Sequence, residues 1–174
     1  AQSHPYQQVC PFAAVGSVAV LSRFPPTRAE PICEDGSGLT AVQVQTPDGP
    51  LWVVSLHLFW PYPHGQYAQV AALRPFLENL EHPILLAGDF NMVPWAYSVR
   101  ALARTTHTRP AGHAGGTFSF DYMRARWPWA GVLPQIPIDH ILTPATGTAG
   151  PLERRQRLGS DHYGLVATFA MVPR

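Results

Sequence analysis

The chain has 174 residues, of which 46% are hydrophobic and 13% are charged, and its formal net charge is +1. This length suits one globular domain with a hydrophobic core, and the composition argues against a disordered chain. The small net charge excludes a strong long-range attraction to polyanions, so any affinity for nucleic acid must come from a local cluster of arginines.

Cysteine content and hydropathy exclude two further classes of protein. The two cysteines, Cys10 and Cys33, are too few for a zinc site with four thiolate ligands. Two alternatives remain for them: two buried thiols, or a disulfide that closes residues 11–32 into a loop and indicates an oxidising compartment. No apolar run reaches the roughly 20 residues that a helix needs to span a bilayer.

Three strands are predicted in the first third of the chain. Residues 15–21 are apolar and rich in β-branched side chains, as expected of a buried strand. Residues 39–45 alternate valine with glutamine, which predicts a strand with one solvated face. Asp48 and Gly49 then form a turn into the apolar residues 51–58, so the second and third strands make a hairpin.

The middle of the chain predicts a strand–helix–strand unit. Apolar side chains recur with helical spacing over residues 65–80, but Pro75 lies inside this range and predicts a kink or a break. Residues 84–87 are wholly apolar and form the next strand. With residues 51–58, they complete a β–α–β step.

The last part of the chain is expected to be less regular. A short helix is predicted over residues 95–104, and a loop rich in glycine, proline and aromatic residues over 105–137. Residues 138–142 and 164–171 form the last two strands. Strand therefore exceeds helix, and residues 1–174 are predicted to form a single domain of the α+β class.

Three polar motifs lie at the ends of predicted strands or beside them: Gly88-Asp89-Phe90-Asn91, Pro137-Ile138-Asp139-His140 and Gly159-Ser160-Asp161-His162. Each alone has a structural explanation, such as an Asx turn, a buried Asp bonded to backbone, or a helix cap. Strand ends at one edge of a sheet converge, so these carboxylates and imidazoles can meet there. A carboxylate at such an edge is costly to bury unless it is paired or binds a metal. Together the motifs predict an active site.

In this order, the motifs resemble those of the endonuclease/exonuclease/phosphatase superfamily, which has a deoxyribonuclease-like fold. Residues 15–25 resemble its strand ending in Leu-Ser-Arg-x-Pro, and His57 stands at the position of its strand histidine. The resemblance implies a four-layer α/β/β/α sandwich, of which this chain is the C-terminal part. Residues 115–118 and 137–140 resemble a bacterial group whose domain often follows membrane helices; the location of this chain stays unknown, and a membrane-anchored or extracytoplasmic one is compatible with this group.

The resemblance implies metal-dependent attack of water on a phosphoester. Asp89 would orient or deprotonate the water, or ligate the metal, and Asn91 would donate a hydrogen bond to a phosphoryl oxygen. Asp161 would ligate the metal directly or through water. Because these ligands are oxygens, the expected metal is Mg²⁺ or Mn²⁺.

The histidines are assigned different roles. His162 would stabilise charge on phosphorus or donate a proton to the leaving oxygen, and Asp139 would hold its ring and favour its charged form. His57 would lie beside the scissile phosphate, although a histidine on a core strand can also be purely structural. His140 points to the opposite face of its strand from Asp139 and is expected to be structural.

The chain departs from the superfamily at its N-terminal side. The early strands of the family end in Asn and in Gln-Glu, and that glutamate is the principal metal ligand, but no glutamate of this chain follows an apolar strand. We therefore expect the first strands to be missing, the metal site to be incomplete, and residues 164–171 to have an unpaired edge. The missing N-terminal segment would be the partner of a chain that is weakly active or inactive alone.

Three functions follow from these observations. The first is hydrolysis of a phosphodiester or phosphomonoester by in-line attack of water. The second is a nuclease that acts on DNA or RNA, and the third is a binding module of the same fold, against which the retained polar residues argue. Residues 100–129 interleave arginines with aromatic side chains, which suits either a grip on single-stranded nucleic acid or a packed lid.

Overall fold

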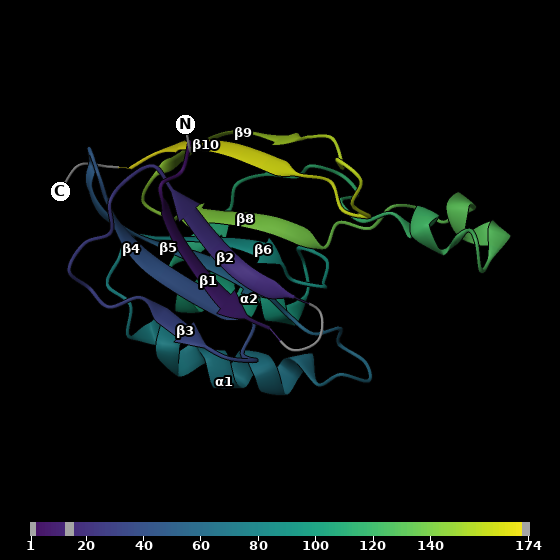
Figure 1. Ribbon diagram of the computed structural model, residues 1–174, viewed down its shortest axis with the longest axis horizontal. Coiled ribbons are helices and arrows are strands. Elements are labelled where there is room, and N and C mark those ends of the chain that lie inside the picture. The colour runs from purple at the N-terminus through teal and green to yellow at the C-terminus, as the bar shows by residue number, and fades with distance from the viewer. Residues whose placement is uncertain (1–2, 13–15, 172–174) are drawn as a thin grey trace.

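A six-stranded sheet forms the centre of the fold in a computed structural model that describes residues 3–12 and 16–171. Its strands are β3 (Ile32–Glu34), β4 (Leu39–Thr46), β5 (Gly49–His57), β6 (Ile84–Asp89), β7 (Thr108–Pro110) and β8 (Asp139–Pro144). They lie in the order β3-β4-β5-β6-β8-β7 (Figure 1). Within this sheet only β5 and β6 run parallel, as the predicted strand–helix–strand unit requires.

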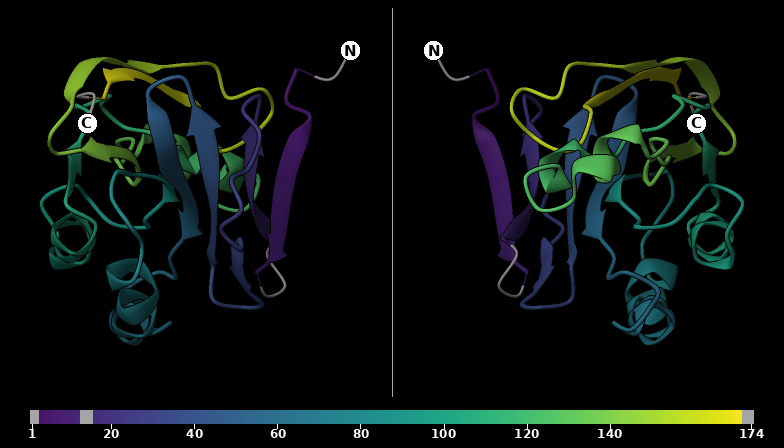
Figure 2. Two further views of the ribbon diagram at one scale, coloured as in Figure 1. Left: turned by 90° about the vertical axis from the view of Figure 1, so that its left-hand side faces the viewer. Right: turned by 90° about the vertical axis from the view of Figure 1, so that its right-hand side faces the viewer.

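Two α-helices, α1 (Gln66–Glu78) and α2 (Tyr97–Thr105), cover one face of this sheet (Figures 1 and 2). The larger hydrophobic core lies beneath them and takes alternate residues from each central strand, such as Val54 and Leu56 from β5 and Leu86 from β6. Alternation arises because successive side chains of a strand point to opposite faces. Among the described residues, no helix is long and apolar enough to cross a membrane.

Two hairpins cover the opposite face of the sheet. One pairs β1 (Tyr6–Pro11) with β2 (Ser17–Ser22), and the other pairs β9 (Thr148–Arg154) with β10 (Leu165–Ala170). A smaller core joins them to the sheet, with Val20 packed near Val44 and Leu51, and with Phe169 beside them. Helices, sheet and hairpins thus form three of the four layers of the expected α/β/β/α sandwich. The fourth layer would consist of α-helices outside the hairpins, and the described part of the chain has none there.

The structure confirms most of the predicted elements. The hairpin of residues 39–45 with 51–58 is β4 with β5, and the short helix at 95–104 is α2. Residue 15 of the first predicted strand lies outside the described residues, and the rest of that strand is β2 with a shifted start. The break proposed at Pro75 is wrong, because α1 continues through it. Pro75 is exposed, so solvent can hydrate the carbonyl that its missing N–H leaves free, while Leu73 and Leu77 pack on the sheet.

Four strands were not predicted: β1, β3, β7 and β9. Both β3 and β7 have three residues and exist only through pairing with a longer neighbour. Strand β9 contains Gly150 and Pro151, which are unfavourable in strands and belong at sheet edges. The 105–137 loop contains, besides β7, the two short 3₁₀ helices η2 (Phe120–Met123) and η3 (Pro128–Val132).

Of the two alternatives for the cysteines, the structure contains the disulfide. Cys10 of β1 is bonded to Cys33 of β3, 23 residues away in sequence. The bond therefore ties the first hairpin to the edge of the main sheet. Two residues after Cys10 in the chain, Phe12 is buried, and its ring contacts that of His57 at a centroid distance of 4.9 Å.

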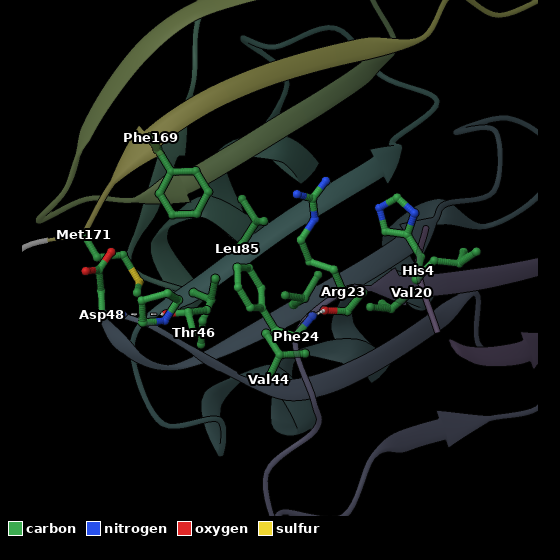
Figure 3. Close-up of a pocket in the computed structure, with 15 residues that line it drawn as sticks. His4, Val20, Arg23, Phe24, Val44, Thr46, Asp48, Leu85, Phe169 and Met171 are labelled. Carbon is green, nitrogen blue, oxygen red and sulfur yellow. Dashed lines mark hydrogen bonds between the residues drawn. The ribbon is translucent and has the colours of Figure 1, made fainter. Parts of the chain in front are cut away.

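An apolar groove of about 510 Å³ lies between the two hairpins (Figure 3). Its lining includes Val44 and Leu85 from the sheet, Val20 from β2, and Phe169 and Met171 at the other side. Strands β2 and β10 each have only one partner strand among the described residues. The unpaired edge predicted for residues 164–171 is therefore confirmed.

Candidate active site

Strand register places three ionisable side chains next to one another at one end of the sheet. His57, the last residue of β5, is paired with Asp89, the last residue of β6. Asp89 is paired in turn with Asp139, the first residue of β8. His57 and Asp89 alternate in phase with Val53 and Leu85, which face the hairpins. The three side chains therefore belong to the hairpin face of the sheet, the face that also carries the groove.

The glycine of the first motif allows β5 and β6 to approach closely at this end. Gly88 has a φ of 147°, and an added Cβ would collide with the carbonyl oxygen of Leu56. The turn that follows is held by Asn91, which adopts a φ of 47°. Its backbone N–H donates a 2.8 Å hydrogen bond to Oδ1 of Asp89, which orients that carboxylate.

The fourth residue of the site, His162, comes from the loop between β9 and β10. Its Nδ1 lies 2.9 Å from Oδ2 and 3.1 Å from Oδ1 of Asp139, so the predicted contact between these residues is confirmed. Its Nε2 lies 3.9 Å from Oδ2 of Asp89, and Nε2 of His57 lies 3.5 Å from that same oxygen. The Asp89 carboxylate thus stands between two imidazoles.

The surroundings shift the proton affinities of these groups in different directions. Burial raises the pKa of Asp89 to about 7, and the negative charge of Asp139 adds to the rise. The hydrogen bond that His162 donates to Asp139 raises the pKa of His162, against the effect of burial. Burial lowers the pKa of His57, with a further contribution from His162. The site therefore favours a charged His162 and a neutral His57, and it gives Asp89 a pKa near neutrality, as acid–base chemistry requires.

Asn91 and Asp161 occupy less central places than the sequence suggested. The Asn91 side chain is 3% exposed, and its Nδ2 donates a 2.7 Å hydrogen bond to the carbonyl of Leu58. Asp161 is partly exposed, and its charge acts on Asp89 and His162. Its backbone carbonyl accepts a 2.9 Å hydrogen bond from the N–H of Ser119. Both residues lie at the site, and their predicted contacts with phosphate and metal remain predictions.

One group of oxygen and nitrogen atoms could hold a cation. Ligand atoms of Asp89, Asp139 and His162 lie within 4.8 Å of one another. Asp89 was predicted as a ligand, whereas Asp139 takes the place in this group that the sequence assigned to Asp161. Two carboxylates and one imidazole suit a hard or borderline divalent ion.

Sequence reasoning assigned no role to Thr117, which positions Asp139. Its buried hydroxyl accepts hydrogen bonds from the backbone N–H groups of Ile138 and Asp139, each at 3.0 Å. Its own carbonyl accepts from the N–H of Tyr163, next to His162. Thr117 thus links the strand of Asp139 to the loop of His162. The only indication of this role in the sequence was that Thr117 lies in the stretch 115–118, which resembles a bacterial group of the family.

His140 confirms the distinction between the two faces of β8. Its Nε2 lies 2.8 Å from the carbonyl oxygen of Met92, and its ring packs edge-on against Phe90 in the core. Burial lowers the pKa of His140. It is structural, as predicted, although its neighbour Asp139 belongs to the site.

Comparison with solved structures identifies the same architecture elsewhere. The β-toxin of Staphylococcus aureus has a TM-score of 0.70 at 16% identity, with 96% of this chain and 78% of that chain covered. A double mutant of β-toxin with bound magnesium ions has a TM-score of 0.63 at 14% identity and covers 95% and 78%. Sphingomyelinase C from Streptomyces griseocarneus has a TM-score of 0.61 at 19% identity and covers 94% and 77%. At these identities the similarity shows a shared fold.

The sequence itself matches one family model. No curated protein sequence matches the chain. The model of the Endonuclease/Exonuclease/phosphatase family matches residues 2–162, which include all three motifs. The chain therefore belongs to the endonuclease/exonuclease/phosphatase family, whose members are hydrolases of the phosphoesterase and nuclease type.

Proposed function

We propose that this chain carries the acid–base half of a metal-dependent phosphoesterase that cleaves its substrate by in-line attack of water. The observation that carries the proposal is the Asp139–His162 pair beside Asp89, at the end of three strands. A partly buried carboxylate with a raised pKa, next to an imidazole held by a second carboxylate, is typical of a hydrolytic site. A binding module would have no need for this arrangement.

Each group has a role that its electrostatics supports. Water attacks phosphorus opposite the leaving oxygen, and Asp89 orients this water and accepts its proton. Charged His162, held through Nδ1 by Asp139, donates a proton from Nε2 to the leaving oxygen as the phosphorus–oxygen bond breaks. His57, favoured in its neutral form, can hydrogen-bond a phosphoryl oxygen from the other side of Asp89. Asn91 is proposed to add a further hydrogen bond to the phosphoryl group.

Divalent Mg²⁺ or Mn²⁺ fits the donor set but is held by few residues. Burial and the charge of Asp139 destabilise the ionised form of Asp89, and a cation would relieve both effects. Asp89 and Asp161 are the proposed ligands, with Asp139 close enough to Asp89 to share in the site. When bound, the metal would neutralise charge on the phosphoryl oxygens. Mg²⁺ binds weakly to so few carboxylates.

The proposal includes a missing carboxylate ligand, supplied by a polypeptide segment N-terminal to this chain. Supporting this, β2 and β10 both have an edge without a strand partner among the described residues, and the groove between them is lined by apolar side chains. Strands placed in the groove would lie on the face of the sheet that carries Asp89 and Asp139. The chain alone is therefore proposed to be a poor catalyst.

The test is hydrolysis of an aryl phosphodiester with Mg²⁺ or Mn²⁺. The chain alone should show little activity, and a chain extended by the residues encoded upstream should gain about a hundredfold or more. In the active form, Asp161→Ala and a chelator should each abolish hydrolysis. Glu81→Gln, an exposed residue just before β6 at the opposite end of the sheet, should leave it unchanged.

Two results would contradict parts of this proposal separately. Full activity of residues 1–174 alone, lost in Asp161→Ala, would show that the site is already complete. Activity of the extended chain that survives the chelator would instead remove the metal from the mechanism.

A further inference from the structure

An arm of the chain projects beyond the end of the sheet that carries the active site (Figure 1). This aromatic arm, residues 120–133, contains η2 and η3 and is rich in aromatic and aliphatic side chains. Within its two short helices only Ala130 is buried. An apolar segment that buries so little of itself marks an interaction surface, because water-exposed apolar patches are disfavoured in a free protein.

The arm is locally ordered by its own contacts. The backbone N–H of Trp127 donates a 2.8 Å hydrogen bond to the carbonyl of Met123. The rings of Trp127 and Trp129 lie 6.5 Å apart, and the guanidinium of Arg126 lies 6.0 Å from the Trp127 ring. Trp129 is 60% exposed and Val132 is 83% exposed. The arm thus exposes tryptophan, aliphatic and arginine side chains to solvent.

The arm is connected to the catalytic residues through Phe118. The Phe118 ring lies edge-on to that of His162, with centroids 5.0 Å apart. It also contacts Phe120 and Tyr122 at the start of the arm, at 5.0 and 5.9 Å. The base of the arm therefore packs against the site, and the rest of the arm extends away from it.

The composition of the arm indicates which partner it fits. Tryptophan and tyrosine, with an apolar body and one polar group, favour the interface between lipid and water. Arg124 and Arg126 form no ion pair in the described residues, and cationic side chains at such a face are attracted to anionic headgroups. Val132 is aliphatic and cannot stack on a nucleobase. Two arginines are also few for single-stranded nucleic acid, whose binding depends on many contacts with phosphates along the strand.

We propose that the aromatic arm is a docking surface for a phospholipid bilayer that contains anionic lipid. Trp127, Trp129 and Val132 enter the interfacial layer, and Arg124 and Arg126 remain at the headgroups. Docking holds the active site at the membrane surface. This inference concerns binding, so its test requires no catalysis and can fail or succeed independently of the proposed function.

The experiment is flotation of the whole chain with vesicles of phosphatidylcholine that contain about one quarter phosphatidylglycerol. The wild-type chain should float with the vesicles. The double variant Trp127→Ser/Trp129→Ser, and separately the single variant Val132→Asp, should lose about tenfold or more in vesicle affinity. Phe76→Ser, which removes an exposed aromatic ring from the last turn of α1, is the matched control and should float as wild type. Circular dichroism checks that each variant is folded.

A second pair of measurements separates lipid from nucleic acid. Arg124→Gln/Arg126→Gln should weaken binding to the anionic vesicles and leave any binding to pure phosphatidylcholine unchanged. Fluorescence anisotropy of a labelled oligothymidine should show weaker binding than that to vesicles. The proposal is overturned if the wild-type chain does not float, if Val132→Asp floats as well as wild type, or if the arm variants lose oligothymidine binding alone.

Discussion

The two faces of the central sheet differ in how completely they are covered. On the helix face, α1 and α2 seal a continuous core in which Leu56, Leu86 and Leu142 are at most 1% exposed. On the hairpin face, β1–β2 and β9–β10 cover the two sides and leave an apolar groove between them. The same strands form both faces, so the difference lies in what packs against them. The helix face is fully covered and forms a hydrophobic core, whereas the hairpin face combines an open groove with the polar site.

Residues that are adjacent in a strand belong to opposite faces of the sheet. Asp139 and His140 are adjacent in sequence, yet Asp139 binds His162 at the site and His140 is bonded to the carbonyl of Met92 in the core. Leu85 lines the groove, and Leu86 is buried beneath the helices. Period-two alternation thus decides which residues are available for chemistry. Such adjacent pairs provide matched variants.

The largest expected effect is on the rate of hydrolysis, and it distinguishes His162 from His140, the two histidines of the motifs. In the active form of the enzyme, His162→Asn should lower the rate by about 10²–10⁴, because it removes the proton donor to the leaving oxygen. It should change the free energy of unfolding little, since His162 is partly exposed. His140→Asn should instead lower the free energy of unfolding by about 1–3 kcal/mol and spare the rate of the folded fraction. Steady-state kinetics and urea unfolding measure both. Equal rate losses in the two variants would remove the functional distinction between the faces.

The second prediction compares Leu86 with Leu85. Leu86→Ala should lower the free energy of unfolding by about 2–5 kcal/mol, because it opens a cavity in a sealed core. Leu85→Ala should cost about 1 kcal/mol or less, since its side chain already borders the groove. Urea unfolding at equilibrium provides both values.

An N-terminally extended chain sharpens this comparison. If strands fill the groove there, the cost of Leu85→Ala should rise toward that of Leu86→Ala. An unchanged cost in the extended chain would show that the groove is not where the segment lies.

The sequence predicted most of the helix face and the family, because those depend on local signals. Periodicity sets α1, β5 and β6, and the register of the β–α–β unit brings His57 beside Asp89. The role of Thr117 was not predictable, since its hydroxyl meets the backbone of Asp139 across 22 residues of sequence. The short strands β3 and β7 likewise depend on their partners, not on their own residues. The hairpin face was hardest to predict because long-range pairing creates it.

The third prediction concerns the disulfide, which secures the first hairpin of the less covered face. Replacing both Cys10 and Cys33 by serine should lower the free energy of unfolding by about 3 kcal/mol, by the loop-entropy estimate for a 23-residue separation. Reductant should destabilise the wild type by a similar amount and leave the double variant unchanged. Intact mass with and without reductant checks that the bond is present. Two free thiols in air-oxidised protein would remove this stabilisation and the argument for an oxidising compartment.

The smallest expected effect arises at Asp89, a partly buried carboxylate of the hairpin face. Because its pKa is raised from 3.8 to about 7, the native state keeps a proton that the unfolded state has already lost between these values. Stability therefore falls as the pH rises through this window, and the penalty is complete above about pH 7. Asp89→Asn removes the penalty while its amide oxygen can still accept the N–H of Asn91. The metal-free variant should melt about 2–4 °C higher than wild type near pH 8, and at about the same temperature near pH 3, where both forms are uncharged.

Magnesium provides the control for this last prediction, because a cation stabilises the charged carboxylate that the fold disfavours. Adding Mg²⁺ near pH 8 should raise the melting temperature of wild type and leave that of Asp89→Asn unchanged. Near pH 3, where Asp89 is protonated in both states, Mg²⁺ should have no effect on either protein. Differential scanning calorimetry of the four combinations measures the coupling directly. A metal-free variant that melts below wild type near pH 8 would mean that the ionised Asp89 is already compensated, for example by His162 and His57 together. The charge of Asp89 would then cost the native state no stability, and the polar site on the hairpin face would not destabilise the fold.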